Sequence, residues 1–110
     1  MSAHQPFLRL GQEYFRLTPG IRLILDIEEE LGSLAGLLEK LQGQSWKVSE
    51  LVTLVHILLE HEGRELDYIV LGQRMLEEGL RGFLASAVEF LRLCLQEGAL
   101  VSVVPVRVAH

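Results

Sequence analysis

The chain of 110 residues has few of the residues on which several classes of protein depend. It contains one cysteine, Cys94, so it forms no internal disulfide, and nothing in it indicates an oxidising compartment. Its 10 basic residues stand against 15 acidic ones, which leaves a net charge of −5. Because the nucleic-acid backbone is bound by a clustered basic face, we expect no nucleic-acid partner.

Long apolar runs are lacking too. Charged residues interrupt every apolar stretch before it reaches the roughly 20 residues that a membrane-spanning helix needs. The first residues, Met1-Ser-Ala-His-Gln-Pro6, do not form the basic and then apolar segments of a signal peptide. We therefore expect a cytoplasmic protein that makes no contact with membranes.

Recognisable catalytic and metal-binding motifs are also missing from the sequence. His56 and His61 are five residues apart, roughly 140° around a helix, whereas a zinc pair on one face needs a spacing of four. There is no glycine loop of the phosphate-binding kind and no G-x-S-x-G elbow for a serine nucleophile. We expect no enzyme activity, no cofactor and no metal, and Cys94 reads as a small core residue.

What the chain does have is apolar residues, which make up 49% of it. That proportion argues against disorder, and the length is enough to bury one core without disulfides or metals. We expect a single α+β domain, mainly α, over residues 7–98. Its first element is a β-hairpin over residues 7–17 that turns near Gly11 and Gln12, because strand-forming residues lie on both sides of a turn glycine.

The apolar spacing and the capping residues predict about five short helices after the hairpin. Thr18 suits the N-cap of the first helix, Pro19 its first turn, and Gly32 its end. The third helix is apolar nearly all round, which is typical of a helix in the middle of a core. The expected ranges are 19–31, 34–42, 50–62, 68–78 and 80–97, with Ser33, Ser49 and Asp67 as the later caps. The apolar stripe expected on the last helix is Leu80, Leu84, Ala87, Val88, Leu91 and Leu95.

The C-terminal residues 99–110 differ in composition from the rest. Valines dominate them, so we expect an extended tail, and Pro105 would confine it to an edge position. Three placements stay open: an edge strand added to the hairpin, a strand paired with another chain, or a loose tail. We also expect a tendency to form homo-oligomers through this tail or through an exposed side of the helix over 50–62.

Several predicted helices end in acidic residues. The clearest case is Glu28, Glu29 and Glu30 before Gly32, and the ends before Gly63, Gly79 and Gly98 repeat it. Acids at a helix C-terminus cost about 0.3–1 kcal/mol each, since that end carries partial negative charge. Two interpretations stay open: an ordinary solvated surface, or a surface that meets a basic partner. Glu28, Glu29 and Glu30 are therefore candidate partner-binding residues.

Trp46 is the only tryptophan, and it lies in the linker between the second and third helices. A tryptophan in a linker either fills the edge of the core or anchors a partner protein, because its large ring is rarely left in water. We favour the first interpretation and keep Trp46 as a candidate partner-binding residue.

From Phe15 to Gly98, about three-quarters of its length, the chain resembles the phage tail assembly chaperone group, including the small tail protein family of gene transfer agents. The resemblance rests on Arg16-Leu-Thr-Pro-Gly20, Ile27-Glu-Glu-Glu-Leu-Gly32, Ser33-Leu-Ala-Gly-Leu-Leu38 and Ser49-Glu-Leu51. Two features depart from the group: the acidic step Leu59-Glu-His-Glu-Gly63 and the valine-rich tail.

The resemblance implies a non-enzymatic role. Proteins of this group hold the long tape-measure protein, or tail-tube subunits, until the tail polymerises. An alternative from another class is a small cytoplasmic adaptor or regulatory module that binds a partner helix outside any phage. A third is an accessory subunit of an enzyme whose active site lies on another chain.

Overall fold

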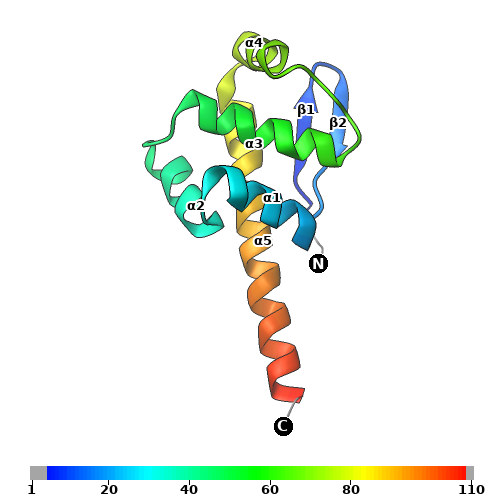
Figure 1. Cartoon of the computed structure of the whole chain (residues 1–110), viewed down its shortest axis with the longest axis vertical. Coiled ribbons are helices and arrows are strands. Elements are labelled where there is room, and N and C mark those ends of the chain that lie inside the picture. The colour runs from blue at the N-terminus through cyan, green and yellow to red at the C-terminus, as the bar shows by residue number, and fades with distance from the viewer. Residues whose placement is uncertain (1–4, 109–110) are drawn as a thin grey trace.

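The computed structural model describes the backbone of residues 5–108 and the side chains of residues 5–96. Within that range the chain forms a mainly helical α+β fold, as the sequence predicts (Figure 1). The elements in chain order are β1 (Phe7–Leu10), β2 (Glu13–Arg16), α1 (Ile21–Leu31), α2 (Leu34–Gly43), α3 (Val48–His61), α4 (Tyr68–Glu78) and α5 (Leu80–Val108).

The predicted hairpin is confirmed. Strands β1 and β2 pair antiparallel, with Phe7 opposite Arg16 and Leu10 opposite Glu13. The turn between them uses Gly11 at a φ of 65°, which glycine adopts without steric cost. Leu8 and Leu10 are buried, while Phe7 on the other face is exposed. This alternation places one face of the hairpin against α4 and α5, which both contact β1.

Helix α3 lies in the middle of the core, as its apolar composition predicts. Seven of its side chains are buried, and α1, α4 and α5 all pack against it. In Figure 1, α3 crosses in front of α5, with α1 below it and α4 above. The buried residues are Leu51, Val52, Leu54, Val55, Ile57, Leu58 and Leu59.

Two predicted helix starts are wrong by two residues. Helix α1 begins at Ile21, because Gly20 has the extended backbone of an N-cap residue, with a φ of −164°. The Thr18 hydroxyl accepts a hydrogen bond from the Gln5 amide instead of capping α1. Helix α3 begins at Val48, before the expected cap Ser49, because the Glu50 carboxylate reaches back to the amide of Lys47 at 2.9 Å.

The other predicted caps agree with the structure. The Ser33 hydroxyl accepts from the Gly36 amide at the start of α2, and Asp67 accepts from the amides of Ile69 and Val70 at the start of α4. Helix α4 spans the range that the sequence predicts.

The predicted extended tail is wrong over residues 99–108. Helix α5 does not end at Gly98 but runs on to Val108, so the structure contains no edge strand in this segment (Figure 1). Extending an existing helix needs no new nucleus, and one glycine costs only about 1 kcal/mol relative to alanine. The strand preference of valine depends on neighbouring strands, which this segment lacks. Residues 109 and 110 lie outside the described range.

The buried stripe of α5 differs from the predicted one. It consists of Phe83, Ala87, Phe90, Leu91 and Cys94. Leu80 and Leu84, expected in the core, are only partly buried and reach its edge. The predicted and the observed stripe both have helical spacing. Helix α5 turns Phe83 and Phe90 toward the core because their rings bury more area than the side chains of Leu80 and Leu84 do. None of the helices in the described range is both long and apolar enough to cross a membrane.

The caps generate a prediction about stability. Asp67→Ala should lower the free energy of unfolding by about 1 kcal/mol, because two amides at the start of α4 lose their acceptor. Thr18→Ala should change it by less than about 0.5 kcal/mol, because Thr18 caps no helix. Urea unfolding followed by circular dichroism measures both. A larger loss for Thr18→Ala than for Asp67→Ala would contradict the observed start of α1.

Candidate protein-binding site

The acidic end of α1 is only partly free to meet a partner. Glu28 is partly buried, and its carboxylate accepts a hydrogen bond at 3.0 Å from the amide of Leu34, the first residue of α2. This bond satisfies an orphan donor at the start of α2 and ties α1 to α2. Glu29 and Glu30 are exposed. Of the three predicted residues, Glu28 thus has an internal structural role.

Acids at the ends of the other helices have internal partners too. The Glu78 carboxylate accepts from the amide of Gly11 at 3.0 Å, across 67 residues of sequence, and so holds the hairpin turn against α4. Glu77 accepts from the Gln73 side chain at 3.1 Å. These contacts explain much of the acidic pattern without a basic partner. The side chain of Glu97 lies outside the described part of the chain.

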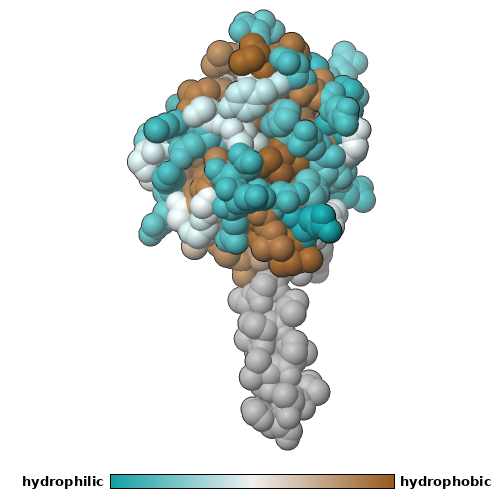
Figure 2. Space-filling model, in the orientation of Figure 1, coloured by the Kyte–Doolittle hydropathy of each residue, from teal (hydrophilic) through white to brown (hydrophobic). Residues whose placement is uncertain are grey.

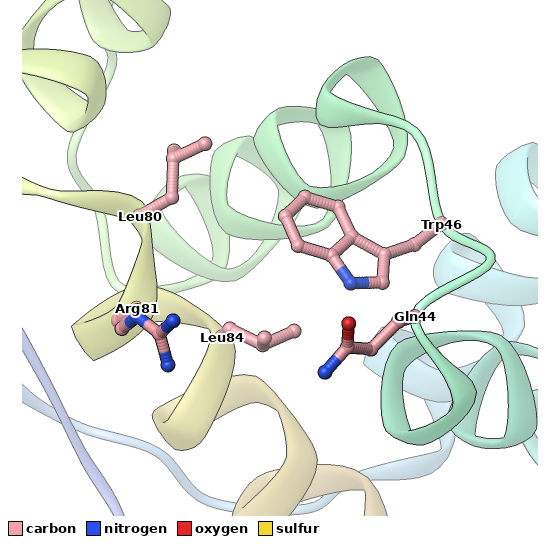
Figure 3. A pocket seen from close by; sticks show the side chains of 5 residues that line it. All are labelled: Gln44, Trp46, Leu80, Arg81 and Leu84. Atoms are coloured by element: carbon pink, nitrogen blue, oxygen red, sulfur yellow. The ribbon is translucent and has the colours of Figure 1, made fainter.

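Trp46 lines an open pocket between the α2–α3 connection and the start of α5. Its ring is partly buried and packs against the core, and it faces Leu80 and Leu84 of α5 across the pocket (Figure 3). Gln44 and Arg81 complete the lining, and the pocket has a volume of about 290 Å³. We call this site the Trp46 pocket. Trp46 therefore fills the edge of the core, as the favoured interpretation holds, and also borders solvent.

Glu50 of α3 fixes the connection between α2 and α3, which contains Trp46, by accepting hydrogen bonds from two lysines. The Glu50 carboxylate accepts from the Lys40 ammonium at 2.7 Å and from the Lys47 amide at 2.9 Å. These two hydrogen bonds, that of Lys40 first, hold the pKa of Glu50 below its usual value. The result is a short connection anchored to α2 at one end and to α3 at the other.

Gln44 in this connection has a left-handed backbone, with a φ of 64°. Its amide closes α2 by donating to the Lys40 carbonyl. Glycine is the residue that usually occupies such a position, because a side chain there is strained. The conformation points the Gln44 side chain to the Trp46 pocket (Figure 3).

The outer face of α4 exposes large apolar side chains. Ile69 is 74% exposed and Leu76 is 56% exposed, and their spacing of seven residues puts them on one stripe of the helix. The opposite stripe, with Leu71 and Met75, is buried against the core. Figure 2 shows apolar surface gathered over α4 at the top of the body. We call Ile69 and Leu76 the α4 stripe.

The α4 stripe and the Trp46 pocket lie on consecutive helices. Leu80, which lines the pocket, follows Leu76 by four residues across the single-residue break at Gly79. Neither feature was predicted from the sequence, because Leu80 and Leu84 were expected in the core and no exposed apolar face was expected on α4. The candidate residues Glu28, Glu29 and Glu30 belong to α1 and do not line this pocket.

The described side chains offer little for catalysis or metal binding. No group of three or more His, Cys, Asp or Glu side chains in that part of the chain could hold a metal ion. Cys94 is buried in the core. The imidazole of His61 is 2.7 Å from the Asp26 carboxylate, and that of His56 is 2.8 Å from the Leu66 carbonyl, so both histidines join elements of the fold.

Comparison with protein-family models, with curated proteins and with solved structures found no match to this chain. The Trp46 pocket and the α4 stripe are therefore defined by the geometry of this chain alone.

The lowered pKa of Glu50 generates a prediction. A lowered pKa in the folded state contributes stability that is present above the unfolded-state pKa and is lost as the pH falls through the folded-state pKa. The free energy of unfolding of the unchanged protein should therefore fall as the pH is lowered from about 5 to about 3. In Glu50→Gln this decrease should be smaller. Lys40→Gln should reduce it as well, because the strongest partner of the carboxylate is gone. Urea unfolding across this pH range tests the claim, and two profiles identical to that of the unchanged protein would contradict it.

Proposed function

We propose that this chain is a non-enzymatic, cytoplasmic tail assembly chaperone of the phage and gene-transfer-agent type. In this role it binds the tape-measure protein, tail-tube subunits or both before the tail polymerises. The exposed α4 stripe, together with the Trp46 pocket, is the observation that supports the proposal most. A chaperone of this kind needs exposed apolar surface that makes reversible contacts, and it needs no catalytic centre.

The chemistry of this surface fits a helical partner. An amphipathic helix inserts apolar side chains at spacings of three, four and seven residues into an apolar groove. The α4 stripe presents two apolar side chains one such interval apart, and the Trp46 pocket on the following helix offers an aromatic wall. A tape-measure protein is a long amphipathic helix that must be kept from aggregating before assembly, so it presents the kind of surface that this site can bind.

A small-molecule ligand fits the site less well. Small-molecule pockets are usually about 300–1,000 Å³ and enclose most of the ligand. The Trp46 pocket has about 290 Å³ and opens to solvent. A side chain of a larger partner would fill such a depression while the rest of the partner lies on α4.

The first test is to sequence the DNA that flanks this reading frame. A tail-tube-like frame upstream and a very long helical frame downstream would support the proposal. Metabolic or regulatory neighbours would contradict it and favour the helix-binding adaptor. The long helical protein encoded downstream is the partner for the binding experiments that follow, and we call it the neighbour protein.

Co-expression with the neighbour protein tests the site. The double variant Ile69→Ser, Leu76→Ser should weaken capture by about tenfold or more, because burial of each such side chain is worth about 1.5–3 kcal/mol. Both side chains are mostly exposed, so the stability of the chain alone should fall by no more than about 0.5 kcal/mol per substitution.

Helix α1 supplies a matched control. Ile21 and Leu25 are 71% and 54% exposed, close to the values for the α4 stripe. The double variant Ile21→Ser, Leu25→Ser should keep capture within about twofold, a difference of less than about 0.5 kcal/mol. If the α1 variant loses capture and the α4 variant retains it, the proposed site is wrong. If the unchanged chain does not capture the neighbour protein, the proposed function is wrong.

A further inference from the structure

The charges around the Trp46 pocket differ from those of the whole chain. The chain carries a net charge of −5, yet none of the five residues that line the pocket is acidic and one of them, Arg81, is basic. Lys47, the residue after Trp46, is basic and exposed as well. The lining of the pocket therefore carries one positive charge and no negative one, on a chain that is acidic as a whole.

Arg81 has no acidic partner among the described residues, whereas three other cations do. Lys40 pairs with Glu50 at 2.7 Å, Arg64 with Glu13 at 2.6 Å and Arg74 with Glu78 at 3.9 Å. Arg81 is exposed and takes part in none of the ion pairs of the described part of the chain. Its guanidinium is thus available to a carboxylate from outside.

The position of Arg81 also conflicts with a local rule. Arg81 is the second residue of α5, and a positive charge in the first turn of a helix costs about 0.3–1 kcal/mol. No acidic residue in that turn offsets the cost. Residues that break a local rule of stability are often functional. The unfavourable charge of Arg81 at an apolar pocket therefore points to a role in binding.

We infer that the Trp46 pocket binds an amphipathic helix with an acidic flank. One apolar side chain of that helix inserts between the Trp46 ring and Leu84, and a carboxylate of the same helix pairs with the Arg81 guanidinium. This inference rests on the proposed function for the existence of a helical partner, and it adds the chemistry of that partner. Such a partner differs from the basic one that was one of the two interpretations of the acidic helix ends.

Two synthetic amphipathic peptides provide the test. They share one leucine stripe and contain no tryptophan; one has glutamates along the flank of the stripe and the other has lysines at the same positions. Trp46 is the only tryptophan of the chain, so its fluorescence reports on this pocket alone. We expect the glutamate peptide to shift Trp46 emission to shorter wavelength and to bind about tenfold more tightly than the lysine peptide at low salt.

The variants decide whether Arg81 causes this preference. Arg81→Gln should reduce the preference to about twofold or less, and Arg81→Lys should retain most of it, because the charge remains. Arg22→Gln is the matched control, since Arg22 is an exposed arginine on α1. It should leave the preference unchanged. Equal binding of the two peptides, binding without a change in Trp46 emission, or equal losses in Arg81→Gln and Arg22→Gln would overturn the inference.

The inference and the proposed function fail in different ways. Capture of the neighbour protein that is lost in the α4 stripe variant but unaffected by Arg81→Gln would overturn the inference and leave the proposed function standing. Preference for the glutamate peptide through Arg81, without any capture of the neighbour protein, would support the inference and contradict the tail-assembly role.

Discussion

The burial of α3 is the constraint on which the rest of the structure depends. Its seven buried side chains each stabilise the fold by about 1.5–3 kcal/mol when removed from water, so the helix must be covered on most of its circumference. Helices α1, α4 and α5 provide that cover. Each of them buries apolar side chains in the core and leaves others outside. On α4 the side chains left outside include Ile69 and Leu76, the two that we propose as the contact for a partner.

Hydrogen bonds to acidic side chains connect the elements that pack around α3. Glu28 joins α1 to α2, Glu78 joins α4 to the hairpin turn, and Asp26 joins α1 to His61 at the end of α3. Because so many carboxylates are engaged within the chain, the acidic composition is a poor guide to the partner. The charge that lines the apolar site is that of Arg81, which is why we infer an acidic helix and not the basic partner that was one interpretation of the acidic helix ends.

Much of the fold could be predicted because its signals are local. Gly11 marks the hairpin turn, Asp67 caps α4, and the apolar composition of α3 places it in the core. The errors have physical causes as well. Leu80 and Leu84 compete with Phe83 and Phe90 for the buried stripe of α5, and periodicity alone does not rank two apolar stripes. The contact between Glu78 and Gly11 spans 67 residues, so no local pattern reveals it. Trp46 was recognised as a candidate, but its neighbours Leu80, Arg81 and Leu84 come from a distant segment, and only the folded chain brings them together.

The central claim is that a body fixed around α3 presents the α4 stripe and the Trp46 pocket to a helical partner. Amide hydrogen exchange of the chain, alone and saturated with the neighbour protein, tests it most directly. The account predicts that α3 exchanges slowest in both samples and that binding adds protection over residues 44–47 and 69–84. Added protection confined to residues 21–31 of α1, with no change at the Trp46 pocket, would contradict it.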